Sequence, residues 1–261
     1  MSMNLPGALA DPSLVADAIV TLTASDGVKT TAFLARPSKV TTKLPGMMIS
    51  IHGLGLDDHM RDLTRRFAGL GMLAIAADTF GRVGGPPDIQ DRDQIMAKIN
   101  AMGDKGAIAD LRASVDWIRS QPESSGPVAG IGFCMGGRLL LMVATDGPVL
   151  DRAIDCWGGR TTRRTQPIDS LHQEVPVERI DRLGCPLLGI FGDDDLDPNP
   201  DDVAELEAAV QRYGKSMLKR SFPGAGHAFL ADTRPSYREA QAHAAWQEIT
   251  TFLRPILAVR G

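Results

Sequence analysis

Short apolar stretches alternate with amphipathic stretches along most of this 261-residue chain. The apolar stretches are typical of buried strands and lie at 46–51, 72–77, 128–131, 149–157 and 186–191, and residues 215–222 are a further predicted strand. Apolar residues at helical spacing predict helices at 60–70, 111–118, 138–144, 203–213 and 237–253. Strands that alternate with helices in this way predict an α/β fold, with a mostly parallel central sheet flanked by helices.

Three segments depart from this alternation. Residues 18–22 and 30–35 flank the turn signal Ser25-Asp26-Gly27 and predict an N-terminal antiparallel hairpin. Residues 83–105 are polar and rich in Gly and Pro at first, then partly helical in pattern, and residues 158–182 are irregular and polar. We expect residues 158–182 to form either a cap over a site or a surface excursion. We expect a single domain over 1–261, with its core at about 15–255.

The segment Gly132-Phe133-Cys134-Met135-Gly136-Gly137 joins an apolar strand to a helical stretch. Strand, G-x-nucleophile-x-G and helix make up the nucleophile elbow of α/β-hydrolases, here with Cys134 at the nucleophile position. The tight turn leaves room only for small residues two positions before and after the nucleophile. The helix N-terminus favours a thiolate at Cys134, and the Met135 N–H is placed to stabilise an oxyanion.

Partners for such a nucleophile follow in the order that this fold requires. The run Asp193-Asp194-Asp195 comes directly after the strand at 186–191, where the acid of a triad belongs. A solvated acidic loop is the alternative interpretation, whereas the spacing lacks the Gly and Glu of a calcium-binding EF-hand. His227 follows the strand at 215–222 within a Gly-rich loop, as a general base that reaches back to Cys134 would.

Composition and charge narrow the class of protein. The net charge is −4, the hydrophobic fraction is 43%, and no basic stripe occurs, which argues against a nucleic-acid partner. The first six residues lack the pattern of a signal peptide, and no apolar run is long enough for a membrane span. Three cysteines do not make a disulfide framework, so Cys156 and Cys185 are expected to be core thiols. A free nucleophilic thiol suits the reducing cytoplasm, which is the expected location.

Together these motifs resemble the dienelactone hydrolase family of α/β-hydrolases. The resemblance covers residues 45–255 and rests on residues 132–137, on Phe191-Gly192-Asp193-Asp194-Asp195, on 224–229 with 233–237 after it, and on 78–82. It implies an α/β-hydrolase fold and a Cys-His-Asp triad that opens small unsaturated lactones without a metal or organic cofactor. Within the aspartate run it selects Asp194 as the acid, and it makes Arg82 the ligand of a substrate carboxylate.

Two positions differ from the family pattern. His52 stands where the family usually has a Glu near the resting thiol, and Ala231 replaces a second arginine expected four residues after the triad histidine. The segment His52-Gly53-Leu54-Gly55 instead resembles the oxyanion loop of other α/β-hydrolases, with the N–H of Leu54 or Gly53 as second donor; we select Leu54. Without that Glu, we expect Cys134 to rest against His227 as a thiolate–imidazolium pair.

The sequence therefore predicts a cofactor-independent cysteine hydrolase whose partner is a small ester or lactone. A general carboxylesterase or thioesterase on the same scaffold is the alternative among enzymes. The alternative outside enzymes is a non-catalytic binding protein with a hydrolase fold. The oligomeric state and the individual substrate are left open.

Overall fold

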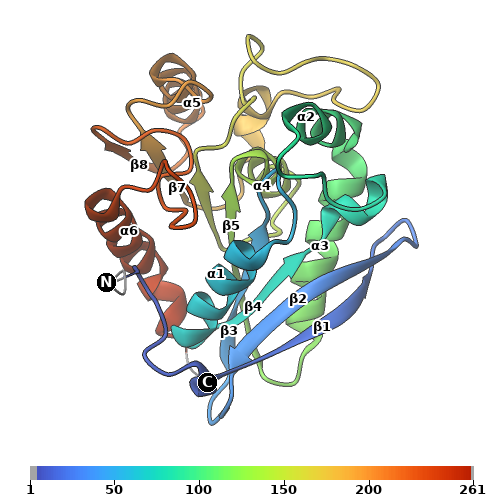
Figure 1. Ribbon diagram of the computed structural model, residues 1–261, viewed down its shortest axis with the longest axis vertical. Helices are drawn as coiled ribbons and strands as arrows, with labels where there is room; N and C mark the ends of the chain where they lie inside the picture. The colour runs from blue at the N-terminus through green and yellow to red at the C-terminus, as the bar shows by residue number, and fades with distance from the viewer. Residues whose placement is uncertain (1–4, 260–261) are drawn as a thin grey trace.

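A computed structural model describes residues 5–259. We expect the N-terminal segment not to be a signal peptide, and residues 1–4 of that segment lie outside the described residues. The described chain forms one eight-stranded sheet in the order β1-β2-β4-β3-β5-β6-β7-β8 (Figure 1). Its strands are β1 (Val15–Thr23), β2 (Lys29–Pro37), β3 (Leu44–Ser50), β4 (Leu73–Ala77), β5 (Ser124–Phe133), β6 (Arg152–Cys156), β7 (Leu187–Gly192) and β8 (Met217–Phe222).

The sheet is parallel from β4 to β8 and antiparallel where β1 and β2 join it. The predicted N-terminal hairpin is therefore confirmed, and so is the mostly parallel sheet. β3 and β4 are buried along their whole length, as expected of strands covered by helices on both faces.

The helices are α1 (Asp58–Gly69), α2 (Arg92–Ala101), α3 (Asp104–Ser120), α4 (Met135–Ala144), α5 (Pro200–Arg212) and α6 (Glu239–Leu257). Short 3₁₀ helices lie at Pro12–Leu14, Thr79–Val83 and Pro176–Arg182. α1 and α6 pack together through Phe67 and Trp246, whose rings lie 5.2 Å apart, while α3 and α4 cover the other face (Figure 1). The cap residue of α6 is Arg238, and the Ser236 hydroxyl before it donates to the Ala228 carbonyl.

Loops that follow β3, β5, β6, β7 and β8 meet at one edge of the sheet, because the carboxyl ends of parallel strands lie side by side there. This edge carries His52, Cys134, Trp157, Asp195 and His227. Ligands of open α/β sheets bind at this edge. The fold thus gathers the candidate residues before any side-chain geometry is considered.

Candidate active site

Cys134 occupies the sharp turn between β5 and α4. Its backbone adopts φ 57° and ψ −121°, a conformation that is uncommon for a residue other than glycine and is found most often at functional sites. A Cβ atom on Gly132 would lie 2.1 Å from the Gly136 carbonyl oxygen, and one on Gly136 would lie 2.1 Å from the Ser50 carbonyl oxygen. The two glycines of the motif are therefore sterically required, and the strand–turn–helix context predicted from the sequence is present.

The structure brings Asp195 against the ring of His227. Nδ1 of His227 lies 2.9 Å from Oδ2 and 3.2 Å from Oδ1 of this carboxylate. The Asp195 side chain is 2% exposed and the His227 side chain 35% exposed, so the carboxylate is enclosed while the imidazole faces the cavity. The selection of Asp194 as the acid is therefore wrong in this structure.

The turn after β7 explains which aspartate faces inward. The Asp195 N–H donates to the Gly192 carbonyl at 3.2 Å, which closes a four-residue turn from the last residue of the strand. Asp193 and Asp194 lie at the exposed centre of this turn. Asp194 contributes through its backbone, because its N–H donates to the Ala225 carbonyl at 2.9 Å and ties the turn to the segment that carries His227.

Cys134 and His227 both line the cavity, and each changes the pKa of the other. Burial disfavours the thiolate, but the charge and hydrogen bond of His227 and the N–H groups of Met135 and Gly53 outweigh it and lower the pKa of Cys134. Burial likewise disfavours a charged imidazole, yet the Cys134 thiolate and the Asp195 carboxylate raise the pKa of His227 to about 10. Both directions favour a thiolate–imidazolium pair at neutral pH.

Two backbone N–H groups, those of Met135 and Gly53, act on the thiol and lower the pKa of Cys134. Met135 was expected as a donor. Of the two candidates for the second donor, Gly53 and the selected Leu54, it is Gly53 whose N–H acts on the thiol, within a turn closed by the Gly55 N–H on the His52 carbonyl at 3.2 Å. Ile99 of α2 covers this residue so closely that a Cβ on Gly53 would lie 2.6 Å from its Cδ1.

His52, which stands at the family's glutamate position, is buried and neutral. Its Nδ1 accepts a hydrogen bond from Arg234 at 2.9 Å, so the proton is on Nε2, which lies 3.0 Å from Asp57 Oδ2. Burial lowers the pKa of His52. Asp57 also accepts the Met60 N–H at the start of α1 and is thereby engaged away from the thiol. Arg234 thus supplies an arginine near the site, three residues after Ala231, a partner that the sequence analysis missed.

Arg82 does not reach the cavity, and its assignment as a substrate ligand is wrong. Its guanidinium donates to both carboxylate oxygens of Asp110, at 2.8 and 2.7 Å, and to Asp26 at 2.7 Å. Asp110 is fully buried and has Thr30 as its other partner. Arg82 therefore links the N-terminal hairpin to α3 as a structural ion pair.

A cavity of about 380 Å³ opens beside Cys134 and His227. Its apolar walls come mainly from α2, α4 and the turn after β7, and comprise Met96, Ile99, Met102, Met135, Leu139 and Leu196. Gly159, Arg160, Gln166 and His172 also line it, so the irregular segment 158–182 forms a wall of the site. A volume of this order suits a small organic ligand.

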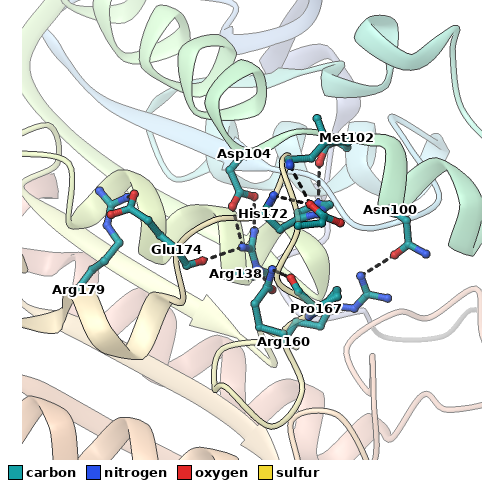
Figure 2. Close-up of polar contacts among 12 residues, drawn as sticks. Asn100, Met102, Asp104, Arg138, Arg160, Pro167, His172, Glu174 and Arg179 are labelled. Carbon is teal, nitrogen blue, oxygen red and sulfur yellow. Dashed lines mark hydrogen bonds and ion pairs between the residues drawn. The ribbon is translucent and has the colours of Figure 1, made fainter.

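The polar wall is organised around Arg138, one helical turn after Cys134. Figure 2 shows its guanidinium directed at Asp104, to which it donates at 2.6 and 2.9 Å, while Nε donates to Gln166 at 2.7 Å. Asp104 neutralises this buried charge. Arg160 donates to the neutral Asn100 amide oxygen at 2.7 Å, and no carboxylate among the described residues pairs with its guanidinium. Arg160 is therefore a cation of the cavity that is free to meet an anion; Arg92 of α2 also lines the cavity.

Residues 5–259 contain no group of three His, Cys, Asp or Glu side chains that could hold a metal ion. Nor does this part of the chain contain a helix long and apolar enough to cross a bilayer.

Comparison with known proteins identifies the family. The model of the dienelactone hydrolase family matches residues 30–257. The "Putative carboxymethylenebutenolidase" of Salmonella typhimurium is 31% identical over 94% of this chain and 89% of its own, and the protein of the same name in Escherichia coli is 32% identical over 91% and 88%. A crystal structure described as a "Putative Dienelactone Hydrolase" from Klebsiella pneumoniae superposes with a TM-score of 0.85 at 27% identity, over 92% of this chain and 98% of that one. The chain belongs to the dienelactone hydrolase family, and its fold is that of the α/β-hydrolases.

Proposed function

We propose that this protein is a cysteine hydrolase that opens small lactones or cleaves small esters, in the manner of a carboxymethylenebutenolidase. The observation that carries the proposal is the array of Cys134, His227 and Asp195 at one end of the cavity, with two backbone N–H groups that act on the thiol. Nucleophile, base, orienting acid and oxyanion donors are the parts that acyl transfer requires.

Each part has a role in the reaction. The Cys134 thiolate attacks the carbonyl carbon, and the negative charge that develops on the carbonyl oxygen is held by the N–H groups of Met135 and Gly53. The carbon–oxygen bond to the alcohol then breaks, and the His227 imidazolium gives its proton to the departing oxygen. His227 next removes a proton from water, which attacks the thioester and releases the acid and the thiolate. Asp195 holds the ring orientation and stabilises its cationic form through both stages.

The cavity suggests where the rest of the substrate lies. Apolar walls suit the carbon skeleton of the acyl group, and Arg160 is placed for a carboxylate carried by that skeleton. The apolar lining and the Gly53 donor also favour the second candidate, a carboxylesterase or thioesterase that takes a neutral acyl chain.

The test compares hydrolysis of a fluorogenic short-chain ester, an acyl thioester and a small unsaturated lactone. Cys134→Ala removes the nucleophile and is expected to lower turnover by up to a million-fold, as loss of a triad nucleophile does elsewhere. Cys185→Ala is the matched control, because this thiol is buried away from the cavity. Turnover by Cys134→Ala near that of the unmodified protein would overturn the mechanism. No hydrolysis of any of the three compounds would favour a binding protein.

A further inference from the structure

Asp155 is a buried carboxyl beside the site that the proposed reaction does not use. It belongs to β6 and is 0% exposed. Its Oδ1 accepts the Gly158 N–H at 2.8 Å, and its Oδ2 has no hydrogen-bond partner among the described residues. Buried carboxyl oxygens are costly when they are unsatisfied, so a carboxyl kept here calls for a reason.

Two glycines border this carboxyl directly, and two more are the partners of Asp155 in the sheet register. In the sheet, Asp155 is in register with Gly132 of β5 and Gly189 of β7. On the helix side, a Cβ on Gly137 would lie 2.3 Å from Oδ1, and one on Gly158 would lie 2.5 Å from the same atom. The carboxyl is therefore wedged between the first turn of α4 and the loop that follows β6.

That loop contacts three parts of the active site. The Cys156 carbonyl accepts the N–H of Cys134 at 3.0 Å. The Trp157 ring lies edge-on to His227, with ring centroids 6.4 Å apart, and Arg160 lines the cavity. Trp157 and Arg160 both adopt positive φ, at 45° and 54°, which side chains other than glycine rarely do. Such a loop persists only where its surroundings hold it, and the bond from Gly158 to Asp155 lies between the two strained residues.

Burial raises the pKa of Asp155 to about 7, and the Gly158 N–H lowers it only in part. The neighbours of the carboxyl on β5, β7, α4 and the loop are glycines, which carry no charge. In its own strand, burial and, after it, the charge of Asp155 raise the pKa of the Cys156 thiol well above the usual range. The carboxyl is therefore expected to change its charge near neutral pH; the nearest charged side chain on α4 is Arg138, which follows Gly137 and is paired with Asp104.

We propose that Asp155 is a positioning residue of the hydrolase: by accepting the Gly158 N–H it fixes the loop that places Trp157 against His227, and it does so more firmly as the carboxylate than as the acid. The proposal rests on the proposed function above. Hydrogen bonds to ionised acceptors are about twice as strong as those to neutral acceptors, so the Asp155 carboxylate holds the Gly158 N–H more tightly than the protonated acid does. The turnover number then rises with pH as Asp155 ionises.

The experiment measures kcat and KM for a neutral ester between pH 5.5 and 9 in three variants. Asp155→Ala removes the acceptor and is expected to lower kcat about tenfold or more, with KM little changed. Asp155→Asn keeps a neutral acceptor and is expected to restore most of the low-pH kcat while losing the rise near neutral pH. Asp151→Asn is the matched control, since Asp151, just before β6, also accepts one backbone N–H, from Val128 at 2.8 Å, but at the opposite end of the strand.

Tryptophan fluorescence gives a readout independent of turnover. A pH-dependent change near pH 7 is expected in the unmodified protein, and it is expected to vanish in both Asp155→Asn and Trp157→Phe. If Asp155→Ala does not fold, the kcat profile of Asp155→Asn and the fluorescence titration still test whether Asp155 is a positioning residue. A normal kcat profile in Asp155→Ala, or a neutral-pH rise that persists in Asp155→Asn, would overturn the positioning role. Absence of any ester hydrolysis by the unmodified protein would instead count against the proposed function.

Discussion

Substitution of the three adjacent aspartates, one at a time, separates the acid suggested by the family motif from the acid that the geometry supports. Asp195→Asn removes the charge 2.9 Å from Nδ1 of His227, whereas Asp194→Asn and Asp193→Asn alter exposed side chains of the turn. A hydrogen bond to a charged group is worth about 1.5–3 kcal/mol, or roughly 10- to 150-fold in rate. The corresponding substitution in a serine triad costs about 10⁴-fold, or about 5.5 kcal/mol, which sets the upper end.

Both the Cys134 thiolate and the Asp195 carboxylate raise the pKa of His227, so loss of Asp195 leaves one anionic partner of the ring in place and the full loss of about 10⁴-fold is not expected. We therefore expect Asp195→Asn to lower kcat/KM about 100-fold or more, and the two neighbouring variants to stay within about threefold. The assay is steady-state hydrolysis of a fluorogenic short-chain ester at pH 7.5. A loss in Asp194→Asn that equals or exceeds the loss in Asp195→Asn would refute the assignment drawn from the structure.

Three further predictions concern two arginines and the thiol. Arg82→Ala leaves the buried Asp110 without its cation, so the free energy of unfolding measured by chemical denaturation is expected to fall by about 3–5 kcal/mol, with charged and neutral esters affected alike. Arg160→Gln is expected to raise KM about tenfold for an ester whose acyl group carries a carboxylate and to spare its neutral analogue; Arg163→Gln, whose arginine is paired with Glu178 at the surface, is the control, and equal losses for both esters would exclude the anion role. Because the lowered pKa of Cys134 keeps the thiolate populated as the pH falls, iodoacetamide is expected to inactivate the protein rapidly well below pH 8; a rate that follows a simple titration near pH 8.5 would contradict the ion pair.

Features with a local cause could be predicted from the sequence. The strands, the helices and the elbow at Cys134 follow from hydrophobic periodicity and from glycine spacing, each of which is contained within a few residues. His227 was found for the same reason, since its loop directly follows a strand. Asp195 was missed because the choice among three like residues depends on how one turn closes at Gly192.

Features that depend on distant partners could not be predicted. Arg82 was interpreted as a substrate ligand because Asp26 and Asp110, which hold it, lie 56 and 28 residues away in the chain. His52 and Arg234 are separated by 182 residues, so nothing in the sequence links them. Long-range ion pairs become visible only when the fold sets them side by side, and they change the roles of residues that a motif alone would assign.

The close contact of Gly136 with the Ser50 carbonyl has a consequence for how this protein can diverge. It fixes α4 onto the end of β3, so the nucleophile and the first residues of the loop with the second oxyanion donor form one rigid unit with the centre of the sheet. Much of the cavity wall, in contrast, comes from α2 and the segment after β6, neither of which contributes a strand. Substitutions that reshape the cavity can therefore accumulate in these two segments while the reacting groups keep their places. Related proteins can in this way keep the same reaction and act on different substrates.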